Sequence, residues 1–292
     1  MLVEQLINGL VLGSTYALIA LGYTLVFGVL DKLNFAHGDL FMLGGFVAVA
    51  ATALGAPVWA GALAAIGVVG VLGLVVELVS FRKFTSRDAH VTAALSSFGL
   101  ALVMVDLAQK AWGTEPVALN VPDAIRSAAL EIGDLRIAYI NIGILASTAI
   151  LLTALWYLVA RTALGRRIRA VADSPVSASL LGINVVRVNQ QTFFIASALA
   201  GLAGVMLGLR TGYVTTELGA TYGIKALAVM AIGGMGDMRG AVVGGILAGL
   251  VEAFAFEVGL GKFGELAVWL LMIGILVARP SGLFGTGREL RA

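Results

Sequence analysis

Three polar residues, Asn34, His37 and Asp39, interrupt an apolar stretch and are the first candidates for chemistry in this chain. Ionisable groups are costly inside a membrane, where they usually face a cavity or a partner. If the segment lies at a membrane mouth, Asn34 is an N-cap and Asp39 faces the positive end of a helix. If it lies deeper, it is a broken helix that lines a pathway. The sequence leaves both interpretations open.

Metal and protease chemistry are poorly supported. The chain has two histidines, His37 and His90, and no cysteine, whereas zinc takes three or four protein ligands. Residues 234–237 (GMGD) match the glycine-x-glycine-aspartate signature of intramembrane aspartyl proteases. Such enzymes need two aspartates that share a proton, and Asp106 is the only conceivable mate. We therefore interpret Asp237 as a turn residue between two apolar segments.

Two acidic residues, Asp106 and Glu252, lie inside otherwise apolar runs. Glu252 falls on a stripe of small residues spaced four apart, which directs its side chain toward another helix. Lys225 and Lys110 are basic residues that could pair with these carboxylates. A structural ion pair therefore explains the two acids as well as a role in a pathway does.

The whole chain is too apolar to cover itself with water-facing groups. Of its 292 residues, 60% are hydrophobic and 12% are charged, against about 25% charged residues in a soluble domain. The formal net charge of +2 is too small to indicate a nucleic-acid partner. The composition predicts an all-α polytopic membrane protein in which residues 1–292 form a single transmembrane domain.

Nine apolar runs approach the length of about 20 residues that spans a bilayer core. They cover roughly Leu6–Leu30, Phe35–Leu54, Pro57–Phe81, Val91–Trp112, Asn141–Ala160, Asn189–Leu209, Tyr222–Met235, Ala241–Val258 and Glu265–Ala278. The seventh is short and rich in glycine, so we interpret it as a full crossing, a half-span or a re-entrant helix. We expect eight or nine crossings, and no internal repeat is evident in the sequence.

Basic residues predict the orientation, because cytoplasmic loops carry an excess of lysine and arginine. They gather in residues 82–87, 161–188 and 279–291, whereas the loop at about 113–140 is mainly acidic. With the three basic segments inside, the acidic loop is extracytoplasmic and the N-terminus lies outside. With nine crossings, the C-terminus lies inside.

The basic segment at about 161–188 also carries apolar residues. Ala178–Asn184 is too apolar for a solvated loop and too short to span a bilayer. We predict a short amphipathic helix that starts near Pro175 and stops at Gly182, which can take the left-handed conformation that ends a helix. Topology and anionic lipid would explain the arginines alone. The apolar side chains favour a surface that docks another protein.

Four motifs occur in order along the chain. They are residues 12–18 (LGSTYAL), residues 34–39 (NFAHGD), residues 173–184 (DSPVSASLLGIN) and residues 233–236 (GGMG). Together they resemble the branched-chain amino acid permeases of ATP-binding-cassette importers, and the LivH-type subunit rather than the LivM-type subunit. In that family a cytoplasmic helix seats in a groove of the ATPase. The resemblance thus assigns ATPase coupling to Asp173, Ala178, Leu180, Leu181, Gly182, Ile183 and Asn184.

One departure from the family pattern lies in this segment. The family often carries a glutamate near the alanine-aspartate pair, where this chain has Ser174 and Pro175. Proline suits the first turn of a helix, so we expect the docking helix to begin here. Any contact that the acidic residue would make is in doubt.

The resemblance implies a permease subunit with no enzyme activity and no cofactor or metal of its own. The chain has no nucleotide-binding loop of the G-x-x-x-x-G-K-[ST] type, so ATP and Mg would be bound by partner subunits. The implied partners are a LivM-like permease, two cytoplasmic ATPases, an extracytoplasmic amino-acid-binding protein and the lipid bilayer, in a bacterial or archaeal cytoplasmic membrane. The implied substrate is a branched-chain or similar neutral amino acid.

Other functions stay open. Relatives of this family move urea and short amides. A secondary transporter or channel that does not use ATP is the rival class, and such proteins often show paired broken helices in inverted repeats.

Thr15 and Tyr16, with the polar residues of 34–39, are candidates for a translocation pathway. Tyr16 and Tyr23 are seven residues apart and share a helix face, and the Tyr16 hydroxyl and ring could contact an amino acid. Buried hydroxyls equally bond back to the preceding turn of their own helix. We favour this structural interpretation for the first run.

Overall fold

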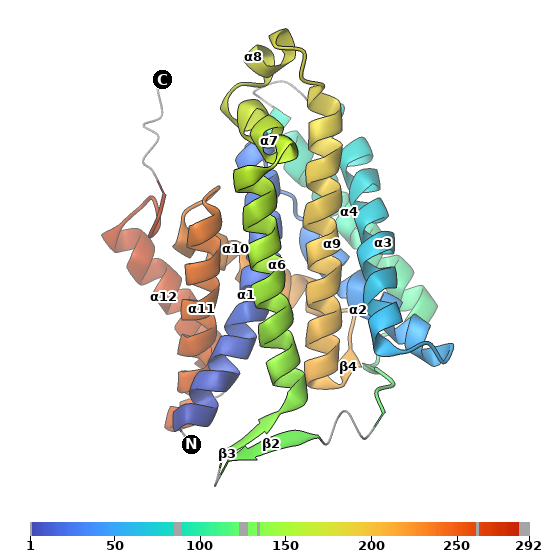
Figure 1. Cartoon of the computed structure of the whole chain (residues 1–292), viewed down its shortest axis with the longest axis vertical. Helices are drawn as coiled ribbons and strands as arrows, with labels where there is room; N and C mark the ends of the chain where they lie inside the picture. Colours follow the sequence, from blue (N-terminus) through green and yellow to red (C-terminus); the bar gives the residue numbers. More distant parts are fainter. Residues whose placement is uncertain (1, 85–88, 123–127, 133–134, 261–262, 286–292) are drawn as a thin grey trace.

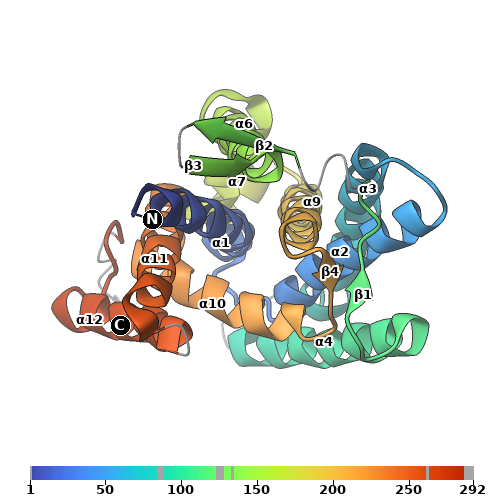
Figure 2. The same cartoon turned by 90° about the horizontal axis from the view of Figure 1, so that it is seen from below.

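The protein is a bundle of membrane-spanning helices with two short two-stranded sheets at one end (Figures 1 and 2). The computed structural model describes residues 2–84, 89–122, 128–132, 135–260 and 263–285. Within these residues, each of the nine predicted apolar runs is a helix. The prediction of an all-α polytopic membrane protein is confirmed.

Six of these helices are long and apolar enough to cross a membrane. They are α1 (Leu2–Leu30), α3 (Val58–Val76, continued by the π-helix η1, Glu77–Phe81), α4 (His90–Trp112), α6 (Tyr139–Arg161), α9 (Val185–Thr211) and α11 (Met238–Ala255). Three more are shorter: α2 (His37–Ala53), α10 (Leu218–Gly233) and α12 (Gly264–Ala278). The sequence analysis described only the run that became α10 as short. Because three helices are shorter than the six long ones, the number of crossings stays a prediction.

The segment at 161–188 folds into two helices outside the bundle, α7 (Ala163–Asp173) and α8 (Pro175–Leu180). They lie at the end of the bundle opposite the N-terminus (Figure 1). The short helix predicted before Gly182 is confirmed, and it starts at Pro175 as expected. Gly182 has a φ of +80°, the left-handed conformation that ends the helix.

Two small sheets lie at the end of the bundle where the chain begins (Figure 2). Strands β2 (Ala129–Ile132) and β3 (Leu135–Ala138) form an antiparallel pair with Ala129 opposite Ala138. Strand β1 (Val117–Ala118) pairs with β4 (Tyr213–Val214), which joins the end of α9 to α10. Strands β1, β2 and β3 lie in the predicted loop at about 113–140, and the sequence analysis did not anticipate any of the four strands.

The helices pack closely through glycines. Around α1 and α11, a Cβ at Gly13 would lie 2.8 Å from the Gly245 oxygen, and a Cβ at Gly9 would lie 2.9 Å from the Leu250 side chain. Because later residues of α1 contact earlier residues of α11, the two helices are antiparallel. Between α2 and α9, a Cβ at Gly44 would lie 2.1 Å from the Gly201 oxygen. Such contacts let backbones touch, which is how helices associate in lipid.

The order of packing repeats in the two halves of the bundle. Helices α1, α2, α3 and α4 correspond in order to α9, α10, α11 and α12. The first helix of each half packs on the second and third helices of the other half: α1 packs on α10 and α11, and α9 packs on α2 and α3. In each half the third helix continues into a π-helix, η1 or η3 (Phe256–Leu260), before the fourth. Helices α1 and α3 run away from the end with the N-terminus, whereas α9 and α11 run toward it (Figure 1). This inverted repeat, which the sequence did not reveal, removes one reason to disfavour a secondary transporter.

Candidate functional site

Helix α8 is short but well capped. The Ser177 amide donates a hydrogen bond to the Ser174 side-chain oxygen over 3.2 Å, and Pro175 occupies the first turn. Beyond Gly182, the Asn184 side-chain oxygen accepts a hydrogen bond from the Arg187 amide over 3.0 Å and caps α9. These caps satisfy amides that would otherwise lack partners. The turn from α8 to α9 is thus fixed on both sides.

The two faces of α8 differ. Ala178 is buried in a cluster with side chains from α1, α7 and α9, and half-buried Ile183 packs against the same cluster. Leu180 and Leu181 are 84% and 80% exposed. Asp173, the last residue of α7, is also exposed. Among the residues predicted for ATPase coupling, Ala178 and Ile183 therefore anchor α8, and Leu180 and Leu181 are available for contact.

The segment from Asn34 to Asp39 lies deep. Asn34, His37 and Asp39 are buried. The His37 ring packs edge-on against Tyr23, with ring centroids 4.5 Å apart, and its Nε2 lies 2.3 Å from where a Cβ at Gly22 would be. Gly22 precedes the end of α1 by eight residues, about 12 Å of helix. Helix α2 therefore begins well inside the bundle, as the broken-helix interpretation requires.

Asn34 does not cap α2, so that part of the membrane-mouth interpretation is wrong. The helix starts at His37, and its N-cap position is Ala36, without a side-chain cap. Asp39 does lie in the first turn, as predicted. Both polar side-chain atoms of Asn34 are buried without a hydrogen-bond partner. Buried polar groups are normally satisfied by protein or water.

The chain between α1 and α2 is tied to α4. The Phe35 amide donates a hydrogen bond to the Ser97 side-chain oxygen over 3.0 Å, and the His90 Nδ1 lies 2.7 Å from the Asp31 carbonyl oxygen. Asp31 itself has a φ of 53°. These contacts position the start of α2 relative to the fourth helix.

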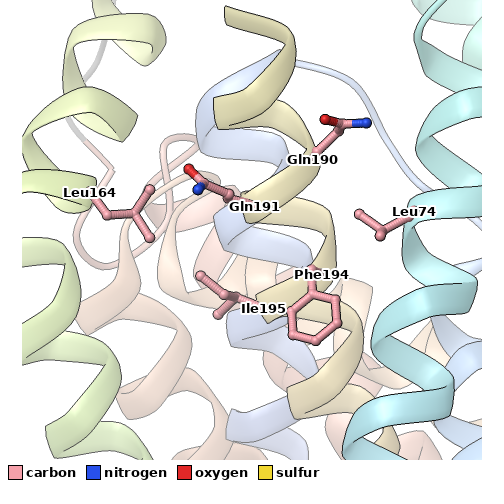
Figure 3. A pocket seen from close by; sticks show the side chains of 6 residues that line it. All are labelled: Leu74, Leu164, Gln190, Gln191, Phe194 and Ile195. Carbon is pink, nitrogen blue, oxygen red and sulfur yellow. The ribbon is translucent and has the colours of Figure 1, made fainter. Parts of the chain in front are cut away.

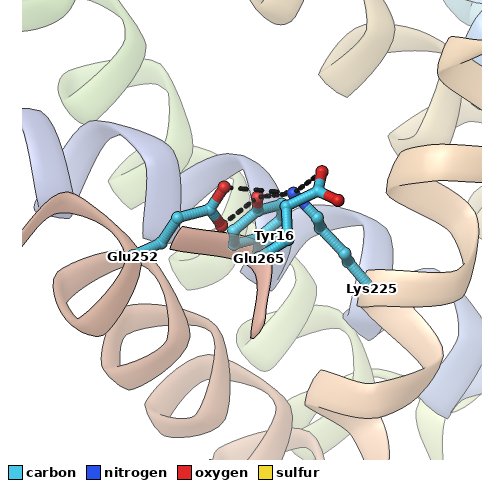
Figure 4. A network of polar contacts seen from close by, with 4 residues as sticks. All are labelled: Tyr16, Lys225, Glu252 and Glu265. Carbon is cyan, nitrogen blue, oxygen red and sulfur yellow. Dashed lines mark hydrogen bonds and ion pairs between the residues drawn. The ribbon is translucent and has the colours of Figure 1, made fainter. Parts of the chain in front are cut away.

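A buried ion-pair network joins four helices (Figure 4). The Lys225 Nζ on α10 lies 3.0 Å from Glu252 Oε1 on α11 and 2.8 Å from Glu265 Oε1 on α12. The Tyr16 hydroxyl on α1 donates a hydrogen bond to Glu252 Oε2 over 2.6 Å and accepts one from Lys225 over 3.3 Å. Lys225 and Glu252 are buried, whereas the Glu265 side chain is 62% exposed.

Several predictions about polar groups can be compared with this geometry. Lys225, one of the two lysines named as possible partners of the acids, pairs with Glu252. The Thr15 hydroxyl bonds back to its own helix, as the structural interpretation requires, but the Tyr16 hydroxyl does not, because it bonds to Glu252. Glu265 was missed, since it stands at the first position of the ninth run and was counted only as a boundary.

Asp106 also has the kind of partner foreseen for it. Its carboxylate pairs with Lys110 over 2.7 Å on the exposed surface of α4. Nothing in this geometry requires a role in a pathway.

A groove of about 350 Å³ opens between α3, α7 and α9 (Figure 3). Its lining consists of Leu74, Leu164, Gln190, Gln191, Phe194 and Ile195. The lining is mostly apolar, and the amides of Gln190 and Gln191 supply its polar groups. It includes none of the residues that the sequence singled out.

Comparison with known proteins gives the family. The model of the family described as branched-chain amino acid transport system / permease component matches residues 5–278. The high-affinity branched-chain amino acid transport system permease protein BraD of Pseudomonas aeruginosa is 32% identical, over 97% of this chain and 95% of BraD. The permease protein LivH of Escherichia coli K12 is also 32% identical, over 97% of this chain and 95% of LivH. A probable LivH of Methanocaldococcus jannaschii is 26% identical, over 97% of this chain and 92% of that protein.

These matches run through all four motifs on which the resemblance was based, and through α8 and the helices on both sides of it. The protein belongs to the family of branched-chain amino acid transport permeases.

Proposed function

We propose that this chain is the transmembrane permease subunit of an ATP-driven importer for leucine, isoleucine, valine or a similar neutral amino acid. Membership of the permease family supports the proposal, as do the names of relatives that match nearly the full chain. Residues 1–292 form one transmembrane domain in this proposal. The chain itself hydrolyses no ATP.

The exposed leucines of α8 carry the coupling part of the proposal. Leu180 and Leu181 protrude from the end of the bundle, and Val176 on the same helix is 72% exposed. Burying a leucine side chain contributes roughly 1.5–3 kcal/mol. A groove on a cytoplasmic ATPase that covered Leu180 and Leu181 would therefore stabilise the complex between the ATPase and the permease. Ala178 holds the helix to the bundle from the other side.

The proposed assembly places α8 in the cytoplasm, with the N-terminus outside and the C-terminus inside. It contains a LivM-like permease, two ATPases and an extracytoplasmic binding protein. The segment at about 161–188 is the coupling segment, and the loop at about 113–140 faces the binding protein. The basic character of residues 161–188 supports this orientation.

Contact alone would not drive transport. A partner shifts a conformational equilibrium only when it binds one state better than the other. In the proposed mechanism, closure of the ATPase pair moves α8, and the fixed turn between Gly182 and Asn184 passes this movement to α9. The bundle then opens to each side in turn.

The test is co-purification and uptake with Leu181→Asp. In this variant an aspartate would have to lose its hydration in an apolar groove. We therefore expect the ATPases to separate from the permease. Leucine uptake should fall at least about tenfold, the equivalent of roughly 1.4 kcal/mol. Leu181→Met, which keeps an apolar side chain of similar volume, is the matched control and should retain both. Full uptake by Leu181→Asp, with the protein present in the membrane, would show that α8 does not couple transport to ATP.

The rival function is a secondary transporter, which the inverted repeat now makes structurally reasonable. It predicts that the chain alone, in liposomes without ATPases, accumulates substrate when an ion gradient is applied across the membrane to drive transport. The proposed importer shows uptake only when ATP and the ATPases are present. Urea and short amides are the competing substrates in the same assay.

A further inference from the structure

The carboxylate of Glu265 lies near the middle of the height of the bundle. It contacts Lys225, which contacts Tyr16. Tyr16 is the central residue of α1, which runs the height of the bundle from Leu2 to Leu30, so the network lies near the middle of that height. The Glu265 side chain is nonetheless 62% exposed. Because a carboxylate in hydrocarbon is costly, this side chain faces water or another protein.

Glu265 is also the member of the network that can exchange its partner. The Lys225 ammonium contacts Tyr16, Glu252 and Glu265. If Glu265 turned away, Lys225 would keep the buried carboxylate of Glu252, which the Tyr16 hydroxyl also holds. Loss of Glu252 would instead leave a buried charge poorly compensated. The exposed carboxylate is therefore the one that is free to bind a passing cation.

The groups beside it carry both signs and include the half-buried ring of Tyr222, whereas Lys225 and the Tyr16 ring are buried. The Lys225 Nζ lies 5.6 Å from the centre of the Tyr222 ring, and the Tyr222 and Tyr16 rings are 5.8 Å apart. A zwitterion with an apolar side chain needs this combination of an anionic group, a cationic group and an apolar surface.

We propose that Glu265 binds the α-ammonium group of a neutral amino acid on its way through the membrane. The proposal rests on the transport function proposed above. It adds a subsite for the charged backbone of the substrate, on the face formed by α10 and α12.

The first test is leucine uptake by the complete complex in proteoliposomes. We expect Glu265→Gln to lower the maximal uptake rate at least about tenfold, while the complex still assembles and keeps its melting temperature. Glu265→Asp keeps the charge and should restore a substantial part of the rate. Glu257→Gln is the matched control, because Glu257 is an exposed glutamate that accepts a hydrogen bond from Gln5 outside the network, and it should transport normally.

The second test uses the absence of cysteine from the natural chain. We expect Glu265→Cys in the complex to react with a charged, water-soluble thiol reagent. Ile150→Cys, at an exposed position in the middle of α6, faces lipid in this proposal and should not react. A Glu265→Cys variant that resisted the reagent would overturn the proposal.

The outcomes separate the two proposals. If the wild-type complex moves no neutral amino acid, the proposed function fails and this subsite fails with it. If the wild type moves leucine and Glu265→Gln moves it equally fast, only the subsite is wrong. If Glu265→Gln lowers uptake solely because assembly or melting temperature falls, Glu265 has a structural role and the subsite is again wrong.

Discussion

The backbones of Gly13 on α1 and Gly249 on α11 are in direct contact: a Cβ at Gly249 would lie 2.2 Å from the Gly13 nitrogen and 2.3 Å from its Cα. Neither neighbour is the end of a flexible side chain, so the helices themselves would have to move apart. The same pair of helices supplies Tyr16 and Glu252 to the buried network. The spacing set by two glycines therefore also sets the geometry of the ion pairs.

Replacing Gly249 with alanine is expected to destabilise the bundle. Overpacking of this kind typically costs about 1–3 kcal/mol, and it should lower the melting temperature of the purified protein. Gly67→Ala on α3 is the control, because nothing lies within 4 Å of a Cβ at that position. Equal melting temperatures for the two variants would show that the contact between α1 and α11 is looser than described.

Replacing Lys225 with methionine should be among the most damaging single changes. It would leave the buried Glu252 carboxylate without its cation, and breaking a buried pair in this way costs about 3–5 kcal/mol. The double variant Lys225→Met/Glu252→Gln removes the stranded charge and should recover much of the loss in thermal unfolding.

An exposed pair supplies the comparison for that variant. Lys110→Met breaks the surface pair with Asp106, which should cost less than about 1 kcal/mol. If Lys225→Met were as mild as Lys110→Met, the network of Figure 4 would not be a buried structural unit.

Replacing Gly182 tests the turn that follows α8. No atom lies within 4 Å of a Cβ at this position, but its φ is +80°, so alanine should cost only the backbone penalty of about 1–2 kcal/mol. Gly182→Asn should be better tolerated than alanine, since asparagine adopts this conformation more readily. Gly182→Pro cannot adopt it, and it also loses the hydrogen bond from the Gly182 amide to the Ser179 carbonyl.

Co-purification of the ATPases measures the effect of the turn. The retained fraction should fall in the order Gly, Asn, Ala, Pro. Undiminished co-purification with proline would show that the orientation of α8 is irrelevant to docking.

Replacing Ser97 with alanine should loosen the chain that leads into α2. The Phe35 amide would lose its part-buried hydrogen bond, and a typical hydrogen bond contributes about 0.5–1.5 kcal/mol. Hydrogen exchange at Phe35 should therefore accelerate. Ser147→Ala removes only a bond from a side chain back to its own helix, so it should leave this exchange unchanged.

Much of the fold was predictable because the apolar runs are long and the bilayer demands helices. The pairing of Glu252 with Lys225 could be foreseen, since both are ionisable residues inside apolar runs with few possible partners. The ends of α8 followed from Pro175 and Gly182, whose backbone preferences are local. Where a residue type restricts its own backbone or its own choice of partner, the sequence is informative.

The remaining features depend on contacts between distant segments. The inverted repeat was not evident in the sequence, because close packing requires only small residues and many sequences satisfy that requirement. The depth of His37 depends on how far α2 descends beside α1, which no local pattern encodes. In the sequence, Glu265 is an ordinary acidic residue at the start of an apolar run. Only the packing of α12 beside α10 brings it to Lys225.

The short connection between α8 and α9 has a mechanical consequence. Only Leu181–Asn184 separates the two helices, and α9 has 27 residues, a rod about 40 Å long. A tilt of about 5° about one tip of such a rod displaces the other tip by roughly 3–4 Å. A slight rocking of α8 would thus be magnified into a gap wide enough to loosen side-chain packing beside β4, at the opposite surface of the membrane.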